Sequence, residues 1–156
     1  MDVIRLGCAK SNLEDYTTTT IHINGINLEH IIEGIESEQF VRQGLHAPNS
    51  CYEGISFFIA FHYQNHFLCK TLKDYVYNKD WYTLYDYKYS GIPGEHSLTC
   101  KIAIEKKKVL WYDFKNFSKI IPFPLDYGNL KFCFDLEQYF HAIATVKNNS
   151  QENRFA

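Results

Sequence analysis

The sequence predicts a single α+β domain: a mainly antiparallel, twisted sheet of about five to six strands, with an N-terminal acidic helix and a C-terminal helix packed on it. Two observations lead to this prediction. Several stretches within residues 17–134 alternate apolar and polar side chains, as strands do. The stretches around 29–38 and 136–146 instead repeat apolar residues at helical spacing. The length of 156 residues suits one core, so we place the domain at 1–147 and a polar tail at 148–156.

The first part of the chain predicts a strand followed by a helix. Residues 17–23 are rich in β-branched side chains, and the turn pair Asn24-Gly25 ends that strand. Asn27 can cap a helix, because apolar residues follow it at the spacing i, i+3, i+4 and i+7: Leu28, Ile31, Ile32 and Ile35. The acids of this segment are expected on the exposed side: Glu29, Glu33 and Glu36. Residues 1–16 leave two alternatives, a short strand or a plug of the core.

The middle of the chain predicts two strands separated by loops. Residues 46–54 indicate a loop by their Pro, Asn, Ser and Gly content. Residues 55–63 are apolar on both faces of an alternating pattern, which is typical of a central strand covered on both sides. Residues 81–89 predict a strand with one mainly aromatic face, made of Trp81, Thr83, Tyr85, Tyr87 and Tyr89.

The last third predicts a hairpin, a connection, a strand and a helix. Residues 98–104 alternate strictly, and the charged run 105–108 forms the hairpin tip before an aromatic and β-branched return strand. Two prolines then favour an extended connection, and residues 130–134 form a short strand. Asp135 caps the final helix, with Gln138 as its capping-box partner. The helix has an apolar stripe of Leu136, Tyr139, Phe140, Ile143 and Val146.

Charge is distributed unevenly along the chain. Residues 11–41 contain no Lys or Arg but hold six acids, so this segment carries −6 and the remainder +4 of the net charge of −2. Such an acidic face repels nucleic acid and attracts a basic protein. The alternative is a solvated helix face that only keeps the protein soluble.

The cysteines and the N-terminus indicate a cytoplasmic protein. The five cysteines are odd in number and scattered without a C-x-x-C pair, which fits a reducing compartment. The N-terminal residues do not follow the pattern of a signal peptide. The longest mostly apolar run, 55–61, is far too short to cross a membrane, so we expect no membrane association.

No catalytic signature is present in the sequence. His62, His66 and Cys69 have a spacing that zinc ligands can use on a helix, but the surrounding pattern favours histidines that flank a turn. There is no G-x-S-x-G motif and no phosphate-binding loop. We therefore expect no catalytic residue, no metal and no cofactor. A Cys–His pair formed by residues distant in sequence stays an open alternative.

The Tyr-rich segment around 75–89 allows three interpretations. Its aromatic side chains could stack nucleic-acid bases, but its Lys and Asp residues balance to zero charge, so we expect no nucleic-acid binding. Exposed Tyr and Trp are also the anchors of protein interfaces. The third interpretation is that about half of these side chains fill the core.

The last third also resembles a known family. The segment K-I-A-I-E-K-K-K-V-L-W-Y-D-F-K-N-F, followed by the Pro-rich link and L-K-F-C-F-D-L-E-Q-Y-F, is similar to immunity proteins of bacterial contact-dependent growth inhibition. The resemblance implies a cytoplasmic, non-enzymatic protein that binds the toxin domain delivered by a neighbouring cell. Such toxins are often nucleases with basic surfaces, which an acidic face complements.

On this interpretation the contact residues are the acids of the N-terminal helix and then the Tyr-rich strand: Glu29, Glu33, Glu36, Glu38, Tyr85, Tyr87 and Tyr89. The alternative function is a small α+β enzyme or small-ligand-binding domain with a Tyr/His-lined pocket. A deep pocket in which ionisable side chains with shifted pKa values converge would distinguish it. A third alternative is a structural subunit of a larger assembly.

Overall fold

Two antiparallel sheets and two long helices form the part of the chain that the computed structural model describes, which is residues 1–10, 17–47, 51–62, 65–88 and 96–154. The larger sheet contains, in spatial order, β4 (Tyr52–Gly54), β6 (Trp81–Tyr87), β7 (Leu98–Ile104), β8 (Lys108–Asn116) and β9 (Phe132–Asp135), with β5 (Val76–Tyr77) paired to β6. The smaller sheet contains β1 (Ile4–Lys10), β2 (Thr17–Ile23) and β3 (Ile26–Asn27). The helices are α1 (Leu28–Arg42) and α2 (Leu136–Arg154). The predicted α+β fold with its two helices is confirmed.

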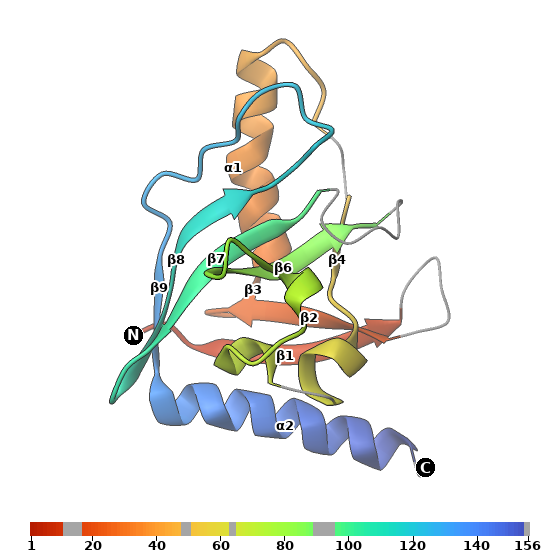
Figure 1. Cartoon of the computed structure of the whole chain (residues 1–156), viewed down its shortest axis with the longest axis vertical. Coiled ribbons are helices and arrows are strands. Elements are labelled where there is room, and N and C mark those ends of the chain that lie inside the picture. The colour runs from red at the N-terminus through yellow and green to blue at the C-terminus, as the bar shows by residue number, and fades with distance from the viewer. Residues whose placement is uncertain (11–16, 48–50, 63–64, 89–95, 155–156) are drawn as a thin grey trace.

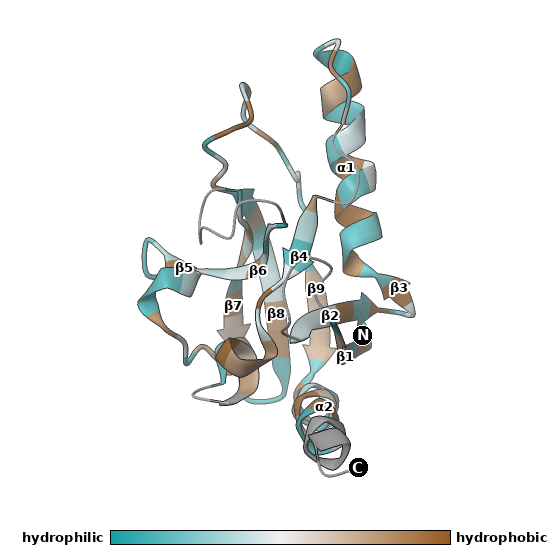
Figure 2. Ribbon diagram, turned by 90° about the vertical axis from the view of Figure 1, so that its right-hand side faces the viewer, coloured by the Kyte–Doolittle hydropathy of each residue, from teal (hydrophilic) through white to brown (hydrophobic). Residues whose placement is uncertain are grey.

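The two sheets meet where β2 passes the end of β4. Thr18 pairs with Ser56 across this junction, and the Thr19 N–H donates a hydrogen bond of 2.9 Å to the Ile55 carbonyl. In Figure 1, β1 and β2 cross below the larger sheet, α2 runs along the β1 side, and α1 rises at the opposite end of the molecule. Figure 2 shows α1 standing beside the larger sheet, with hydrophilic and hydrophobic residues mixed along its length. The small sheet therefore links the two helices.

Trp111 on β8 is the centre of a buried aromatic cluster. Its ring stacks on Phe67 with centroids 5.9 Å apart and meets Phe134 edge-on at 5.4 Å. Its indole N–H donates to the Tyr139 hydroxyl at 3.2 Å, and that hydroxyl donates to the Phe67 carbonyl at 2.5 Å. This chain of hydrogen bonds joins β8, α2 and the short 3₁₀ helix His66–Leu68, so that buried polar groups of three elements satisfy one another.

Replacing Tyr139 by phenylalanine should lower the free energy of unfolding by about 1.5 kcal/mol, because the Phe67 carbonyl and the Trp111 indole lose their common partner while the packing volume stays the same. Urea unfolding followed by tryptophan fluorescence measures this loss. Phe140, one position along the same helix but 44% exposed, provides the control: Phe140→Leu should change the stability little. A Tyr139→Phe variant as stable as the parent would contradict the hydrogen-bond chain.

The predicted central strand at 55–63 is wrong. Ser56 forms only an isolated bridge, and a π-helical turn then runs over Phe58–His62. The turn buries Ala60 and Phe61 but leaves Phe58 exposed. The periodicity of a short apolar segment does not show whether it forms a strand or a helix. Here the segment forms a single π-helical turn. The predicted loop at 46–54 contains the short strand β4.

The predictions of the β7–β8 hairpin and of the start of the C-terminal helix are confirmed. β7 and β8 pair in an antiparallel register with Ile104 opposite Val109, and the tip carries an ion pair between Lys108 and Glu105. Asp135 caps α2 by accepting a hydrogen bond of 3.1 Å from the Gln138 N–H. The Gln138 side chain does not complete a capping box, because it binds both backbone polar groups of Ile4 on β1.

The N-terminal segment and helix α2 add three findings to the comparison with the prediction. Within residues 1–10 the chain forms strand β1 over Ile4–Lys10, and Ile4 and Leu6 on it are also core residues, whereas residues 11–16 of that prediction lie outside the described residues. The prediction that Phe140 belongs to the apolar stripe of α2 is wrong, because this residue is 44% exposed. The helix continues to Arg154, so the segment predicted as a polar tail begins as helix.

Candidate functional site

Helix α1 buries one of the acids that the sequence places on its exposed side. Its buried residues follow one another at intervals of four: Leu28, Ile32, Glu36 and Phe40. Glu36 is only 5% exposed, so the prediction that it lies on the exposed side of the helix is wrong. Glu29 and Glu33 are half-buried. Glu38 is exposed, and its carboxylate oxygen Oε2 lies 3.7 Å from the Arg42 guanidinium nitrogen Nη2. The four acids therefore have different surroundings and do not form one continuous acidic face.

The Glu36 carboxylate is the centre of a buried hydrogen-bonded cluster. The Tyr52 hydroxyl donates to it at 2.5 Å and the Tyr127 hydroxyl donates to the same oxygen. The Asn116 amide in turn donates to the Tyr52 hydroxyl at 2.7 Å. Burial raises the pKa of Glu36, and the hydrogen bonds from Tyr127, Tyr52 and Asn116 oppose that rise. The cluster ties α1 to β4, to β8 and to the connection before β9.

The Tyr-rich strand does not present the predicted row of exposed tyrosines. The pairing of β6 with β7 is irregular between Thr83 and Tyr85, so three consecutive residues, Thr83, Leu84 and Tyr85, are buried. Tyr85 is only 3% exposed, which makes it a core residue in the free protein rather than an exposed contact. Tyr87 is half-buried, with its ring edge-on to His96 at 5.7 Å. Tyr89 lies outside the described residues.

Cys51 and His96 form the arrangement that most resembles a catalytic pair. The Cys51 Sγ lies 3.8 Å from His96 Nε2, and His96 Nδ1 lies 2.9 Å from the Ser118 hydroxyl. The His96 ring stacks on Tyr52 at 5.0 Å. Burial, with Glu36 and Glu33 nearby, raises the pKa of Cys51 to about 12, and burial lowers the pKa of His96 to about 4. Both groups are thus neutral at pH 7, which suits a hydrogen-bonded core pair and does not suit nucleophilic attack by a thiolate.

Iodoacetamide should therefore leave Cys51 unmodified in the native protein at pH 8, because its thiol is 2% exposed and protonated. Cys8 is exposed and should be alkylated under the same conditions, which provides an internal control. In urea both should react. Mass spectrometry of the tryptic peptides measures the two extents, and rapid alkylation of Cys51 in the folded chain would contradict a protonated, buried thiol.

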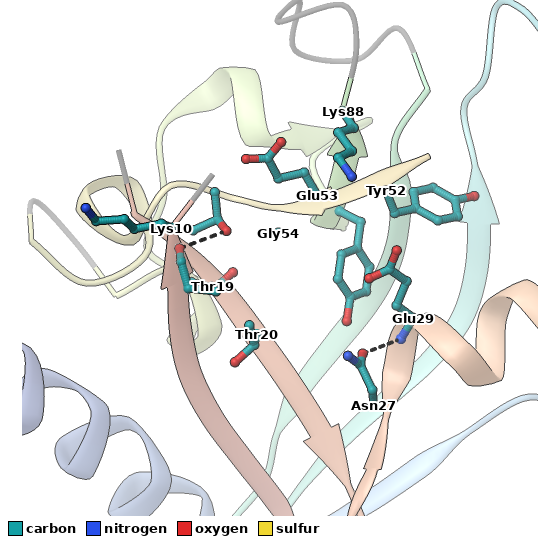
Figure 3. Close-up of a pocket in the computed structure, with 12 residues that line it drawn as sticks. Lys10, Thr19, Thr20, Asn27, Glu29, Tyr52, Glu53, Gly54 and Lys88 are labelled. Carbon is teal, nitrogen blue, oxygen red and sulfur yellow. Dashed lines mark hydrogen bonds between the residues drawn. The ribbon is translucent and has the colours of Figure 1, made fainter. Parts of the chain in front are cut away.

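A polar cavity of about 280 Å³ lies between the two sheets and the start of α1 (Figure 3). Its lining combines hydroxyl, charged and aromatic residues: Ala9, Lys10, Thr18, Thr19, Thr20, Asn27, Glu29, Tyr52, Glu53, Gly54, Tyr85 and Lys88. Burial and the neighbouring Glu33 raise the pKa of Glu29, and burial raises the pKa of Tyr85 above its ordinary range. The lining thus contains tyrosines and ionisable groups with raised pKa values but no histidine, and the cavity is half open to solvent, so the predicted deep Tyr/His-lined pocket stays a prediction.

His66, which the sequence offers as a possible metal ligand, has other partners. His66 is fully buried, and its two ring nitrogens lie 2.6 Å from the Thr71 hydroxyl and 2.6 Å from the Thr83 carbonyl. Within the described residues no group of three or more His, Cys, Asp or Glu side chains is placed to hold a metal ion. In the same part of the chain, neither helix has the length and apolar composition needed to cross a membrane.

Comparison of the chain with protein-family models, with curated proteins and with solved structures found no match.

Sequence reasoning missed the residues that the fold brings together around Glu36. Tyr127 lies 91 positions along the chain from Glu36, and His96 lies 45 positions from Cys51, so no local spacing connects them. One signal was present for Glu36 itself: it continues the i, i+4 series that begins with Leu28 and Ile32 and ends with Phe40. A carboxylate in such a series is a candidate for a buried, hydrogen-bonded group.

Proposed function

We propose that this protein is an immunity protein, which binds a cognate bacterial toxin domain in the cytoplasm and neutralises it without catalysis by covering its active or substrate-binding surface. The resemblance of the last third of the chain to immunity proteins of contact-dependent growth inhibition supports this function. A basic nuclease is the toxin class we favour, because exposed Glu38 and half-buried Glu29 and Glu33 on α1 would attract a basic surface.

The observation that carries the proposal is an open groove of about 650 Å³ between α1 and residues 126–128. Half-buried Ile31 and Ile35 belong to its lining. Charged and polar residues also line it: His30, Glu38, Gln39, Arg42 and Asp126. Apolar side chains together with charged ones are the usual composition of a protein–protein interface. This composition supports a contact with another protein at α1.

The same helix is held rigidly against the rest of the molecule. The Gln39 side chain forms two hydrogen bonds with the Asp126 backbone, one of 2.6 Å to the carbonyl and one of 2.8 Å from the N–H. Phe40 meets Phe123 edge-on with ring centroids 5.0 Å apart. A surface that is already ordered loses less entropy on binding, so these contacts favour high affinity.

The test is capture of the toxin followed by growth rescue. The tagged protein is incubated with lysate of its native organism at two salt concentrations, and bound proteins are identified by mass spectrometry. We expect one stoichiometric partner whose expression arrests growth and whose toxicity is relieved by this protein. A partner without toxic activity, or a toxin that this protein binds but does not neutralise, would overturn the proposal.

Two substitutions on α1 then test the contact surface. Gly34 lies in the groove and a Cβ placed there meets no atom within 4 Å, so Gly34→Gln should fold normally, obstruct the groove and weaken toxin binding at least tenfold. Glu38→Lys should slow association and flatten its salt dependence. Glu137→Lys makes the same charge change at an exposed position of α2 and serves as the matched control. Equal association rates for the two lysine variants would exclude α1 as the contact surface.

A further inference from the structure

Helix α1 contains a glycine that the fold itself does not require. Gly34 lies in the interior of the helix, where glycine is less favourable than alanine. A Cβ placed on it would meet no atom within 4 Å outside its own helix backbone. Its φ is not in the left-handed region that favours glycine. Neither packing nor backbone geometry within the folded chain therefore explains a glycine here, and the space above it is open.

Gly34 is one corner of a four-residue hole on the groove side of α1. The four residues follow one another at the spacing i, i+3, i+4 and i+7, and all of them line the groove: Ile31, Gly34, Ile35 and Glu38. Residues at this spacing form the hole into which a side chain of a facing helix packs. Ile31 and Ile35 are half-buried because they also pack against the core, so they form fixed apolar walls. The missing side chain of Gly34 deepens the hole, which therefore suits an apolar side chain from another helix.

The apolar surface continues along α1 with Val41. This residue follows Gly34 by seven positions, so it lies on the same side of the helix, and it is 72% exposed. Positions 31, 34, 38 and 41 alternate steps of three and four residues, as the contact positions of packed helices do. Helix α1 thus carries a second side with apolar residues besides the one that faces the core.

The charged groups of the groove favour a basic residue beside the apolar one. The lining contains the carboxylates of Glu38 and Asp126 and the guanidinium of Arg42, so its charged groups carry −1. Asp126 Oδ1 accepts a hydrogen bond of 2.8 Å from the Gly128 N–H, which fixes that carboxylate on the wall opposite α1. The Glu38 and Arg42 side chains are 75% and 73% exposed, so their ion pair is weak and Glu38 can exchange Arg42 for a cation of a partner.

We propose that the toxin binds α1 through one of its own helices. An apolar side chain of leucine or methionine size from that helix fills the hole at Gly34, a second one covers Val41, and a lysine or arginine beside them pairs with Glu38. This inference rests on the proposed function and specifies which part of the toxin makes the contact. Gly34 lowers the stability of α1, and its role is to let the partner helix approach.

Gly34→Ala separates this role from a structural one. The variant should unfold at a higher urea concentration than the parent, yet bind the captured toxin domain at least threefold more weakly, because the new Cβ holds the partner's side chain out of the hole. Val41→Ser should weaken binding at least fivefold without lowering the unfolding temperature, since this side chain is exposed in the free protein. Val3→Ser makes the same change at a 54% exposed position outside α1, and it should bind as the parent does.

Hydrogen exchange of the toxin domain identifies the segment that binds. We expect protection in one helix that carries apolar residues at i, i+3 or i+4, and i+7, with a lysine or arginine next to them. A toxin that is bound and neutralised equally well by the parent, Gly34→Ala and Val41→Ser, or whose protected segment is not helical, would overturn this inference and leave the proposed function standing. If no toxin is neutralised at all, the proposed function fails and this inference fails with it.

Discussion

Replacing Gly54 by alanine should lower the free energy of unfolding by about 3 kcal/mol or more, the largest loss we expect from a single methyl group in this chain. The new Cβ would stand 1.9 Å from the Thr19 carbonyl oxygen and 2.9 Å from its carbonyl carbon. Both atoms belong to backbone, so no side-chain rotation relieves the clash. The strands can separate only by giving up the bond from the Thr19 N–H to the Ile55 carbonyl and the pairing of Thr18 with Ser56.

Urea unfolding followed by circular dichroism measures this loss, and Gly34→Ala provides a matched control. Gly34 lies within α1, where a Cβ meets no atom within 4 Å. Alanine has the higher helix propensity, so that variant should be more stable than the parent by up to about 1 kcal/mol. If Gly54→Ala lowers the free energy of unfolding and Gly34→Ala raises it, the loss at Gly54 comes from the steric clash and not from the change in backbone flexibility. A Gly54→Ala variant as stable as the parent would show that β2 and β4 do not approach this closely.

The elements that could be predicted are those whose evidence is local. The alternation from Leu98 to Ile104 and the charged tip after it define the β7–β8 hairpin, and Asp135 defines the start of α2. Each depends on residues within a few positions of one another. The segment after Ile55 could not be predicted from local evidence. Nearly every side chain in it is apolar, and several backbone conformations bury such a segment equally well.

The candidate sites could not be predicted in the same way, because they depend on contacts between distant segments. The cavity needs β2, β4, β6 and the start of α1 together, and only Glu29 and Tyr85 among its lining residues were expected to be functional. Both were expected as exposed contacts for a protein. The irregular register at Thr83 explains the error for Tyr85, since an irregularity of one residue moves the following side chains to the other face of the strand.

Replacing Glu36 by alanine should lower the free energy of unfolding by about 2 kcal/mol at pH 7. The hydroxyls of Tyr52 and Tyr127 lose their common acceptor, and each becomes a buried donor without a partner. Relief from burying a carboxylate offsets part of this cost. Glu36→Gln keeps the volume and one acceptor oxygen, so its loss should be smaller. Urea unfolding of the three proteins measures both differences, and an alanine variant equal to the parent would contradict the cluster.

The pH dependence of the same variants tests whether burial of the Glu36 carboxyl outweighs its hydrogen bonds and raises its pKa. Burial raises its pKa above the ordinary value of 4.5, so between that value and the raised pKa the folded chain holds more protons than the unfolded chain. The free energy of unfolding of the parent should therefore fall as the pH rises through this window, and Glu36→Gln should lack that part of the fall. Glu29, whose pKa burial also raises, contributes equally to both proteins and cancels from the difference. If the difference between parent and Glu36→Gln stays constant from pH 4.5 to pH 7, Glu36 titrates in the folded chain as it does in the unfolded one, which would contradict a raised pKa.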